Sequence, residues 1–425
     1  MYDVLVIGGG AAGFYGAIHV AQNCPNAKVA LLERGKEVLT KVKVSGGGRC
    51  NVTHAEFDPR QLTKNYPRGE KELLGPFHGH ASGDVVAFFE ERGISLKIEP
   101  DGRMFPKTDS SQTIIDCFLK EADRLGVEVI KKASVMALAH KQGPTPHWEV
   151  QTHEKCFTST HVLVATGSNP KIWDILKGLG HTVVPPVPSL FTFNINDERI
   201  ANLPGLSAHA EISIVPHEGP SVKTKKDREG EELTAEGPVL ITHWGLSGPA
   251  VLKLSAWGAI SLNKWGYHFK VRINWAPEYH HQGLLELLGD IKKVERKTIS
   301  RTKVVDLPKR LWTHLVLAAG ISKDTTWPEA TKTELQTLAD QVTNCLFQVN
   351  GKSTFKEEFV TAGGVDLKEV NFKDFGSKLL PNLFFAGEVL NIDAITGGFN
   401  FQNAWTGAYL AAQGITAQRQ TQEPS

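Results

Sequence analysis

The chain has 425 residues, more than the roughly 250 to 300 at which one hydrophobic core stops growing, so two or more packed units are expected. Hydrophobic residues make up 41% and charged residues 22%, as in an ordinary folded protein. The 47 basic and 46 acidic residues leave a formal net charge of +1, which excludes a general attraction to nucleic acid or anionic membranes. Binding to nucleic acid or to an anionic membrane would need a local patch of positive charge.

Cysteine usage and the start of the chain indicate a cellular compartment. The five cysteines are scattered without a CxxC pair, which argues against a disulfide framework and against a zinc site, so we predict reduced thiols and no metal. The first residues enter a strand pattern without the features of a signal peptide. The apolar stretch of residues 4–18 is interrupted by glycines and is too short to cross a bilayer. We expect a cytoplasmic protein with no membrane partner.

A βαβ unit opens the chain. Residues 2–7 form a short apolar run that ends in glycines, residues 11–21 have a helical pattern, and residues 28–32 are strand-like again. The α/β pattern continues with a predicted helix at residues 109–125 and predicted strands at residues 127–130, 147–152 and 161–165.

The composition changes at a stiff linker that contains Pro185, Pro186 and Pro188. Residues 188–277 alternate in hydrophobicity and are rich in turns, as in a small β-barrel. Residues 278–347 have a helical period, with candidate helices at residues 284–288, 309–319 and 334–345. The pattern then returns to a strand at residues 383–386 and a helix at residues 400–413.

These elements predict an α/β fold in which a Rossmann-like domain is built from two sequence segments, residues 1–187 and 348–425. A β-barrel-like domain (188–277) and a small helical subdomain (278–347) are inserted between the segments.

A dinucleotide fingerprint follows the first strand. Gly8, Gly10 and Gly13 form GxGxxG at the start of a helix, where glycines permit a sharp turn, close approach of a pyrophosphate and tight helix–strand packing. The helix N-terminus adds unpaired N–H groups and a positive dipole. Glu33 lies 20 residues after Gly13, where a carboxylate accepts hydrogen bonds from ribose hydroxyls and repels the 2′-phosphate of NADP.

Three distant segments favour FAD over NAD. The first contains Ser45, Gly46, Gly47 and Gly48, whose backbone can lie flat against an aromatic ring system. The second is Ala165, Thr166 and Gly167 at the end of a strand, and the third contains Gly387, Glu388, Gly397 and Gly398. FAD is long enough that its ribityl chain and isoalloxazine need protein groups beyond the pyrophosphate site.

Six segments carry a specific resemblance: KVKVSGGGRCNVTH, DGRMFPKTDSSQ, LVATGS, THWGLSGPAVLKLS, VTAGGV and FFAGEVLNIDAITGGFNFQNAW. In this order they resemble the signatures of the bacterial aminoacetone-oxidase-like flavoprotein family, whose members are also called NAD(P)/FAD-dependent oxidoreductases. The resemblance implies an FAD-binding Rossmann-like domain split by a β-barrel and a helical subdomain. Family activities include amine oxidation, reduction of conjugated C=C bonds in steroids, and dihydrouridine formation in ribosomal RNA.

The fingerprint, the three segments and the resemblance together select a set of FAD-binding residues. These residues are Gly8, Gly10, Ala11, Ala12, Gly13, Glu33, Arg34, Lys41, Ser45, Gly46, Gly47, Gly48, Arg49, Cys50, Asn51, Val135, Ala165, Thr166, Gly167, Gly387, Glu388, Gly397, Gly398, Phe399 and Asn400. By resemblance, Val135 meets the adenine and Arg49 meets the flavin. The chain departs from the family pattern at His54, Asn391 and the pair Phe375–Gly376.

Two side chains are candidates for proton transfer. Cys50 could protonate a carbon after hydride delivery if Arg49 or His54 tunes its pKa, and the alternative is a small buried thiol that fills space. His54 could be a general acid or a substrate contact, and the alternative is a loop histidine bonded to backbone. The glycines before Phe399 also predict a helix start, which we expect to point at the flavin ring and stabilise its anionic reduced form.

Residues 292–310 form a basic stretch. Eight cations stand there against Glu295 and Asp306: Lys292, Lys293, Arg296, Lys297, Arg301, Lys303, Lys309 and Arg310. The stretch is either a surface that docks ribosomal RNA or the solvated face of surface helices.

The leading hypothesis for the function is an FAD-dependent oxidoreductase that takes electrons from NAD(P)H and reduces an activated double bond of a small molecule. The alternatives are an amine oxidase that uses dioxygen, a flavin-dependent uridine reductase acting on ribosomal RNA, and a flavin-binding module without turnover. Only one dinucleotide fingerprint is present, so NAD(P)H would have to bind transiently at the flavin.

Overall fold

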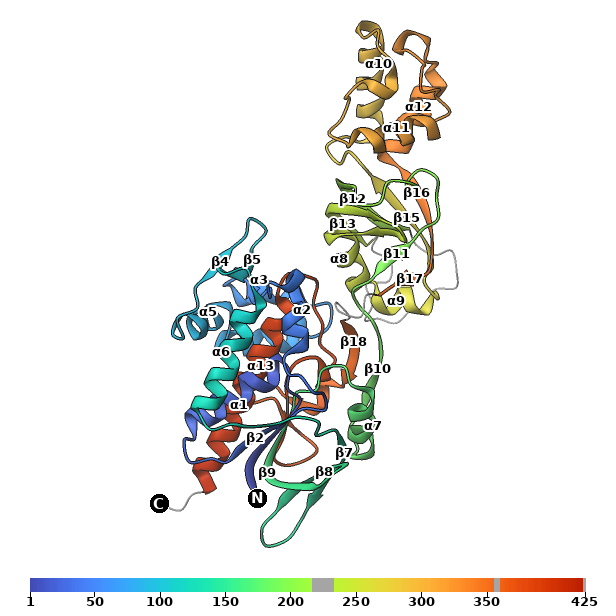
Figure 1. The fold of residues 1–425 in the computed structure, drawn as a ribbon. Helices are drawn as coiled ribbons and strands as arrows, with labels where there is room; N and C mark the ends of the chain where they lie inside the picture. The colour runs from blue at the N-terminus through green and yellow to red at the C-terminus, as the bar shows by residue number, and fades with distance from the viewer. Residues whose placement is uncertain (216–232, 355–359, 423–425) are drawn as a thin grey trace. The chain divides into compact units, whose positions relative to one another are not determined.

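The computed structural model describes residues 1–215, 233–354 and 360–422 (Figure 1). The chain divides into two compact units. We call Met1–Val187 with Val360–Ser425 the Rossmann unit, and Pro188–Phe359 the inserted unit. The second segment of the Rossmann unit begins at Val360 and not at the expected residue 348, because β16 (Cys345–Asn350) pairs with a strand of the inserted unit.

A nine-stranded sheet forms the centre of the Rossmann unit. Its main path is β19-β20-β21-β9-β1-β2-β6, with β8 beside β9 and β7 beside β8. The strands are β1 (Tyr2–Ile7), β2 (Val29–Leu32), β6 (Glu128–Ile130), β7 (Val135–Lys141), β8 (His147–Thr152), β9 (Cys156–Val164), β19 (Val370–Asn371), β20 (Gly376–Ser377) and β21 (Leu383–Phe385). The expected α/β fold with a two-segment Rossmann-like domain is confirmed.

The central strands of this sheet are parallel. β1 pairs in parallel with β2 and β9, and β21 pairs in parallel with β9. Val4, Leu5 and Val6 of β1 are fully buried, as is usual when both faces of a parallel sheet are covered. The carboxyl ends of parallel strands meet at one edge of a sheet, which is where such folds bind their ligands.

Helices and small sheets complete the Rossmann unit (Figure 1). The helices are α1 (Ala11–Asn23), α2 (Thr40–Gly48), α3 (Pro59–Thr63), α4 (Glu70–Gly79), α5 (Ser82–Glu90), α6 (Ser111–Arg124), α7 (Pro170–Gly178), α13 (Phe399–Gln422) and the 3-10 turns η3 (Leu367–Glu369) and η4 (Gly387–Val389). β3 (Thr53–His54), β4 (Leu96–Ile98) and β5 (Arg103–Pro106) form one small sheet, and β10 (Val183–Pro188) pairs with β18 (Thr361–Val365). α1 and α13 pack closely, since a Cβ at Gly16 would lie 3.6 Å from Ala408 Cβ.

A seven-stranded sheet forms one part of the inserted unit. The order is β16-β15-β12-β13-β14-β11-β17, and every pairing given for it is antiparallel. The strands not yet located are β11 (Thr192–Asn194), β12 (Ser207–Val215), β13 (Thr234–Thr242), β14 (Gly245–Ser247), β15 (His268–Asn274) and β17 (Lys352–Ser353). The two end strands, β16 and β17, are separated only by Gly351, so the sheet curls until its ends meet.

Helices of the inserted unit share one hydrophobic core with its sheet. They are α8 (Pro249–Trp257), α9 (Ala259–Lys264), α10 (His281–Val294), α11 (Lys309–Ala318), α12 (Lys332–Thr343) and the 3-10 turns η1 (Ile299–Arg301) and η2 (Trp327–Glu329). α10, α11 and α12 gather at one end of the unit (Figure 1). Thr331 caps α12 by accepting from the Glu334 amide at 3.1 Å.

Element boundaries differ from the expectations in three places. Residues 40–44, for which the sequence analysis predicted no helix or strand, are helical, because the glycines that break α2 come only at its end. α12 ends at Thr343, since Cys345 already begins β16. α13 continues to Gln422, nine residues beyond the expected end at residue 413.

His80 is a buried titratable group in the core of the Rossmann unit. Its Nε2 lies 3.0 Å from the Tyr15 hydroxyl, and its ring stacks on Tyr409 with centroids 4.1 Å apart. Burial lowers the pKa of His80 from 6.5 to about 4. In the unfolded chain this histidine binds a proton below about pH 6.5, whereas in the folded chain it stays neutral down to about pH 4.

Unfolding stability is therefore expected to fall as the pH is lowered from 6.5 towards 4. His80 alone accounts for about 2 kcal/mol of this loss at pH 5. In His80→Gln the loss between pH 7 and pH 5, measured by urea unfolding, should be smaller by that amount. The exposed His153→Gln serves as the control. Equal losses in His80→Gln and the parent would contradict this linkage.

Candidate functional site

The glycine turn after β1 has the backbone geometry of a phosphate site. Gly8 has φ 114°, and a Cβ there would lie 2.4 Å from the Ala165 carbonyl oxygen. A Cβ at Gly13 would lie 1.9 Å from the Gly8 carbonyl oxygen. Gly10 is different, since no atom lies within 4 Å of its Cβ position, and it is the N-cap of α1. Gly8 and Gly13 are thus packed against backbone atoms, whereas Gly10 is open. A pyrophosphate could meet the helix N-terminus at Gly10.

Glu33 follows β2 and braces the same turn. Its carboxylate accepts the amide of Gly9 at 2.8 Å and the amide of Gly35 at 2.6 Å. A carboxylate has about four acceptor positions, so a ribose hydroxyl can still be bound beside these two amides. Glu33 thus has a structural role that its spacing from Gly13 did not predict.

The end of α2 forms a backbone cradle. Gly46, Gly47 and Gly48 have φ values of 57°, 68° and 85°. No atom lies within 4 Å of the Cβ positions of Gly47 and Gly48, whereas a Cβ at Gly46 would lie 2.8 Å from the Phe105 ring. Two consecutive glycines therefore present bare backbone to open space, as a flat ring system requires.

The Arg49 side chain is held by Glu99 and Phe105. Its Nη1 donates to Glu99 Oε1 at 2.6 Å, and its guanidinium carbon lies 4.0 Å from the centroid of the Phe105 ring. The hydrogen bond to Glu99 raises the pKa of Arg49. The expected contact between Arg49 and a flavin is therefore not supported, because the side chain anchors the cradle to the β4–β5 hairpin.

The second and third segments reach the glycine turn from other strands. Gly167 has φ 60°, and its Cβ position lies 3.7 Å from Glu388 Oε2. That oxygen also accepts from Lys41 Nζ at 2.6 Å and from the Ser168 hydroxyl at 3.3 Å. A Cβ at Gly387 would lie 3.4 Å from Ala12 Cβ of α1. Segments more than 300 residues apart in the chain thus meet at the carboxyl edge of the sheet.

The segment before α13 is locked to β3. With the Asn51 amide oriented to satisfy both of its ends, its nitrogen donates to Thr53 O at 3.0 Å and its oxygen accepts the Gly398 amide at 2.9 Å. A Cβ at Gly398 would lie 2.6 Å from backbone atoms of Thr53. Asn400 pairs with Ala394, accepting its amide and donating to its carbonyl, both at 3.0 Å.

These contacts do not support Gly398 as the residue that brings the start of α13 close to the flavin ring, and the effect of that helix start on the reduced flavin stays a prediction. The Gly398 amide already has the Asn51 acceptor, and Gly398 is required by its contact with Thr53. The Asn400 side chain braces the preceding loop and does not extend from the helix end.

Val135 and Arg34 flank the Glu33 turn. Val135 is a buried residue at the start of β7, and the nearby Ala133 amide donates to the Glu33 carbonyl at 2.8 Å. Arg34 is exposed. The departure at Phe375 affects packing, since this side chain is fully buried and its ring would lie 2.9 Å from a Cβ at Gly407.

Cys50 does not have the surroundings of a proton donor to substrate. The residue is fully buried, with φ 61°, and its amide donates to the Ser45 carbonyl at 3.0 Å. Burial raises the pKa of the Cys50 thiol to about 12. The structure supports the alternative of a buried thiol that fills space under the cradle.

His54 is held by its neighbours on both sides. Its Nε2 lies 3.1 Å from the Asp101 carbonyl oxygen, so this nitrogen carries the proton and Nδ1 is unprotonated in the neutral ring. The ring stacks on Phe399 with centroids 4.6 Å apart, and Nδ1 is buried without a hydrogen-bond partner among the described residues. A general acid needs a proton on a nitrogen that reaches substrate, so the backbone-bonded alternative is favoured.

The sequence analysis missed the ion pair of Arg68 with Asp393. Both guanidinium nitrogens Nε and Nη2 donate to this carboxylate, whose side chain is completely buried. The pair fixes the loop that leads to Gly397, and the Ile395 amide adds a bond to Asn65 O at 3.1 Å. An acid inside a glycine-rich segment was a visible signal, but no local pattern names a partner 325 residues away.

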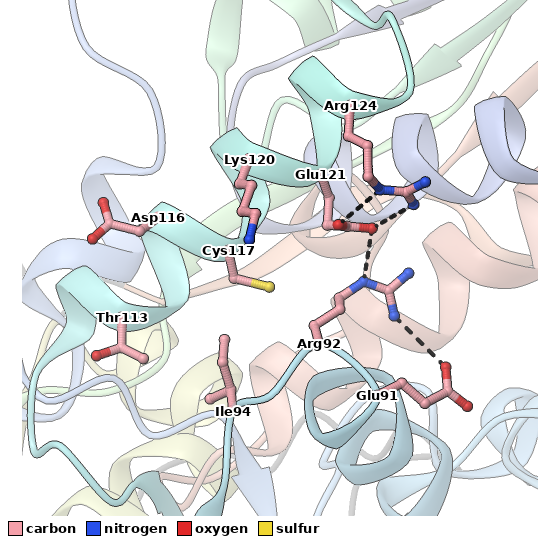
Figure 2. A pocket seen from close by; sticks show the side chains of 9 residues that line it. All are labelled: Glu91, Arg92, Ile94, Thr113, Asp116, Cys117, Lys120, Glu121 and Arg124. Carbon is pink, nitrogen blue, oxygen red and sulfur yellow. Dashed lines mark hydrogen bonds and ion pairs between the residues drawn. The ribbon is translucent and has the colours of Figure 1, made fainter.

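A cavity of about 600 Å³ lies elsewhere in the Rossmann unit (Figure 2). It is lined by Glu91, Arg92, Ile94, Thr113, Asp116, Cys117, Lys120, Glu121 and Arg124, none of which was selected for the cofactor. Glu121 accepts from Arg124 at 2.8 Å and from Arg92 at 3.2 Å, and these bonds lower the pKa of its carboxyl. The charges of this cavity balance one another and join α6 to the end of α5.

The basic stretch of residues 292–310 is partly neutralised. Lys293 pairs with Asp290 at 2.8 Å, Lys297 with Glu295 at 3.8 Å, and Lys303 with Asp306 at 2.8 Å. The other cations have no ion pair with the described residues, and three of them donate to backbone carbonyls. Within the described ranges, no helix is long and apolar enough to cross a membrane, and no cluster of three metal-binding side chains occurs.

Comparisons with known proteins agree with this geometry. The family model described as HI0933-like protein Rossmann domain matches residues 2–414. Two relatives named ribosomal RNA dihydrouridine synthase are each 28% identical to this chain: that of Haemophilus influenzae over 97% of the chain and 98% of the relative, and that of Escherichia coli over 98% of both. A 3-dehydro-bile acid delta(4,6)-reductase of Clostridium scindens is 25% identical over 97% of the chain and 98% of the relative.

None of these names is aminoacetone oxidase, so the resemblance noted in the sequence holds at the level of the flavoprotein family and not of that activity. The family model covers both segments of the Rossmann unit and the inserted unit between them. The chain therefore belongs to the HI0933-like Rossmann-domain family of FAD-dependent oxidoreductases.

Proposed function

We propose that the chain reduces the C5–C6 double bond of uridine in ribosomal RNA, with FAD held by the Rossmann unit. The observation that carries the flavin site is the open backbone at Gly10, Gly47 and Gly48, next to glycines whose Cβ positions are filled by protein. The substrate assignment is supported by two full-length relatives that carry this name.

The Rossmann unit would hold FAD along the carboxyl edge of its sheet. Gly10 and the start of α1 would meet the pyrophosphate, and Glu33 the ribose. Val135 would lie at the adenine. Glu388, whose Oε2 already gathers Lys41 and Ser168, has a second carboxylate oxygen to offer a ribityl hydroxyl.

The flavin ring would lie on the cradle of Gly47 and Gly48. FAD, when bound, supplies hydride exchange at its N5 atom. The chain's own contribution is to hold this cradle rigid: Arg49 anchors it through Glu99, and Asn51 connects it to Gly398. Rigid positioning of the ring against the substrate lowers the entropic part of the barrier.

A reductase fits the names of all three relatives, because the uracil C5–C6 bond and the bond reduced in a dehydro-bile acid can both be conjugated to a carbonyl. Such a bond accepts a hydride at the carbon remote from the carbonyl and a proton at the adjacent carbon. We infer NAD(P)H as the electron donor, binding transiently at the flavin. Cys50 is fully buried, and the His54 ring has its Nε2 at the Asp101 carbonyl and its Nδ1 buried, so we assign that proton to solvent.

Gly10 and Gly13 offer a matched pair for the cofactor site. Gly10→Ala should leave the thermal stability of the FAD-free protein unchanged, because nothing lies within 4 Å of the new methyl group, but should weaken FAD binding about tenfold or more by filling the space of the pyrophosphate. Gly13→Ala should instead lower stability, because its methyl group would strike the Gly8 carbonyl. FAD titration and thermal unfolding measure both. Unaltered FAD affinity in Gly10→Ala would refute this pyrophosphate site.

The substrate proposal is tested with unmodified ribosomal RNA transcripts. FAD-loaded protein with NADH or NADPH, kept anaerobic, should add two hydrogen atoms to a uridine, detected by mass spectrometry of nuclease digests. A conjugated steroid enone and a primary amine with dioxygen are the comparison substrates. Turnover of the enone without any change in the RNA would assign a small-molecule reductase instead, and amine-dependent oxygen consumption would assign an oxidase.

Replacement of the buried thiol tests the correction at Cys50. A general acid contributes about 10² to 10⁴ in rate. Because Cys50 is inaccessible, Cys50→Ala should retain RNA reduction within about tenfold of the parent, well short of that loss. The measurement is the rate of flavin reoxidation by RNA after anaerobic reduction. A loss of 10² or more with intact FAD binding would restore Cys50 as the proton donor.

A further inference from the structure

Trp244 is an exposed aromatic side chain on a rigid turn of the inserted unit. It lies between β13 and β14, and 60% of its surface is accessible. Its amide donates to Thr242 Oγ1 at 3.2 Å, and its carbonyl accepts the Ile195 amide at 2.9 Å. The next residue, Gly245, is locked because a Cβ there would lie 2.2 Å from the Phe193 carbonyl oxygen. The indole is therefore presented to solvent by a backbone that is already fixed.

An exposed tryptophan held in this way is suited to stacking. Its large ring adds apolar surface to solvent, which folding alone does not favour. Since the backbone is ordered before binding, little further entropy is lost when a flat partner packs on the ring. Nucleic-acid bases are such partners, and stacking on aromatic side chains is the common way in which proteins hold single-stranded RNA.

Unneutralised cations lie on the same unit. Of the eight cations in residues 292–310, three pair with carboxylates, which leaves five without an ion pair among the described residues: Lys292, Arg296, Arg301, Lys309 and Arg310. Hydrogen bonds to neutral carbonyls do not remove the charge of Lys292, Arg296 or Arg310. η1 and α11, which carry Arg301, Lys309 and Arg310, are joined by the Trp312 Nε1 bond to Ile299 O at 2.9 Å. Lys292 and Arg296 lie in and just after α10, which is at the same end of the unit (Figure 1).

One segment of the chain connects the tryptophan with the cations. Its first residue, Ile195, is bonded to Trp244, and Asn202 accepts from the Arg310 guanidinium. Between them the Glu198 carbonyl lies 3.3 Å from His314 Nδ1 of α11. An aromatic platform and a cationic surface therefore border the same short segment, 195–202.

We propose that Trp244 and the five cations form a docking surface for single-stranded RNA, with Trp244 stacking on a base and Arg301 and Lys309 meeting phosphates. This proposal rests on the proposed function for its partner. A positively charged face that carries one exposed aromatic side chain is complementary to a phosphate backbone with unstacked bases. The RNA surface lies on the inserted unit, whereas the proposed flavin site is formed by the Rossmann unit.

The first experiment measures RNA affinity of the FAD-loaded full chain by fluorescence anisotropy, with a labelled oligouridine of about twelve nucleotides, within the site sizes known for single-strand binding. Trp244→Ala should weaken binding about tenfold, and Trp244→Phe, which keeps an aromatic face, should recover most of it. Val294→Ala is the control for loss of exposed apolar surface, because Val294 is 78% exposed beside the cations and has no ring that could stack on a base. Parent-like affinity in Trp244→Ala would overturn the stacking role.

The second experiment tests the phosphate contacts. In the double variant Arg301→Glu with Lys309→Glu, the slope of log affinity against log salt should fall by about 1.4, because each phosphate contact with a single strand contributes about 0.7. An unchanged slope, or no salt-dependent binding by the parent, would overturn the docking surface. FAD absorbance of each variant verifies that the Rossmann unit is intact.

The outcomes separate this surface from the proposed reaction. If the parent forms dihydrouridine and Trp244→Ala does so with equal affinity and rate, the surface is wrong and the reaction stands. If RNA binding depends on Trp244 and no uridine is reduced, the surface stands and the reaction is wrong.

Discussion

The close approach of Gly8 to Ala165 is the contact on which the Rossmann unit depends. A Cβ at Gly8 would lie 2.4 Å from the Ala165 carbonyl, so the ends of β1 and β9 can meet only if this residue is glycine. The same turn is bonded to Glu33 after β2 and packed under Gly387 after β21. Four strand ends thereby reach one place, and the parallel order of the sheet puts them at the same edge.

The glycines of this site fall into two groups, those whose Cβ position is filled by neighbouring protein atoms and those whose Cβ position is open. Gly8, Gly13, Gly46 and Gly398 are required by neighbouring atoms, since a side chain would collide with the protein itself. Gly10, Gly47 and Gly48 face open space. The φ values of Gly47 and Gly48 also favour glycine, whereas Gly10 has φ −95°, which any residue adopts. A ligand that needs the space at Gly10 explains the glycine there, and this is the physical basis for placing the FAD pyrophosphate at that turn.

Features set by backbone geometry could be predicted from the sequence, whereas side-chain partners could not. The GxGxxG turn, the strand ends and the glycine cradle follow from local patterns whose constraints act within a few residues. Arg49 and Asn400 were assigned to the flavin because of their position in such patterns, yet their partners are Glu99 and Ala394. Asp393 shows the same limit, because its charge is matched by Arg68 from a distant loop. The domain boundary expected at residue 348 lies at residue 360 in the structure for a related reason. The pairing of β16 with β15, which keeps β16 in the inserted unit, is a contact between distant residues that no local pattern predicts.

Neither Cys50 nor His54 is suited to donate a proton to the substrate, because each is held by neighbouring protein groups. Cys50 is buried directly after the cradle, and His54 is stacked on Phe399 and bonded to the Asp101 carbonyl, so both side chains support backbone segments of the proposed site. Because these two side chains hold the backbone of the proposed flavin site in place, other side chains would have to recognise the substrate. Trp244 is exposed on an ordered turn, and four of the five unneutralised cations of the inserted unit are exposed, so these side chains are accessible to a substrate. The two compact units therefore correspond to the two proposed roles, with FAD held by the Rossmann unit and RNA docked on the inserted unit.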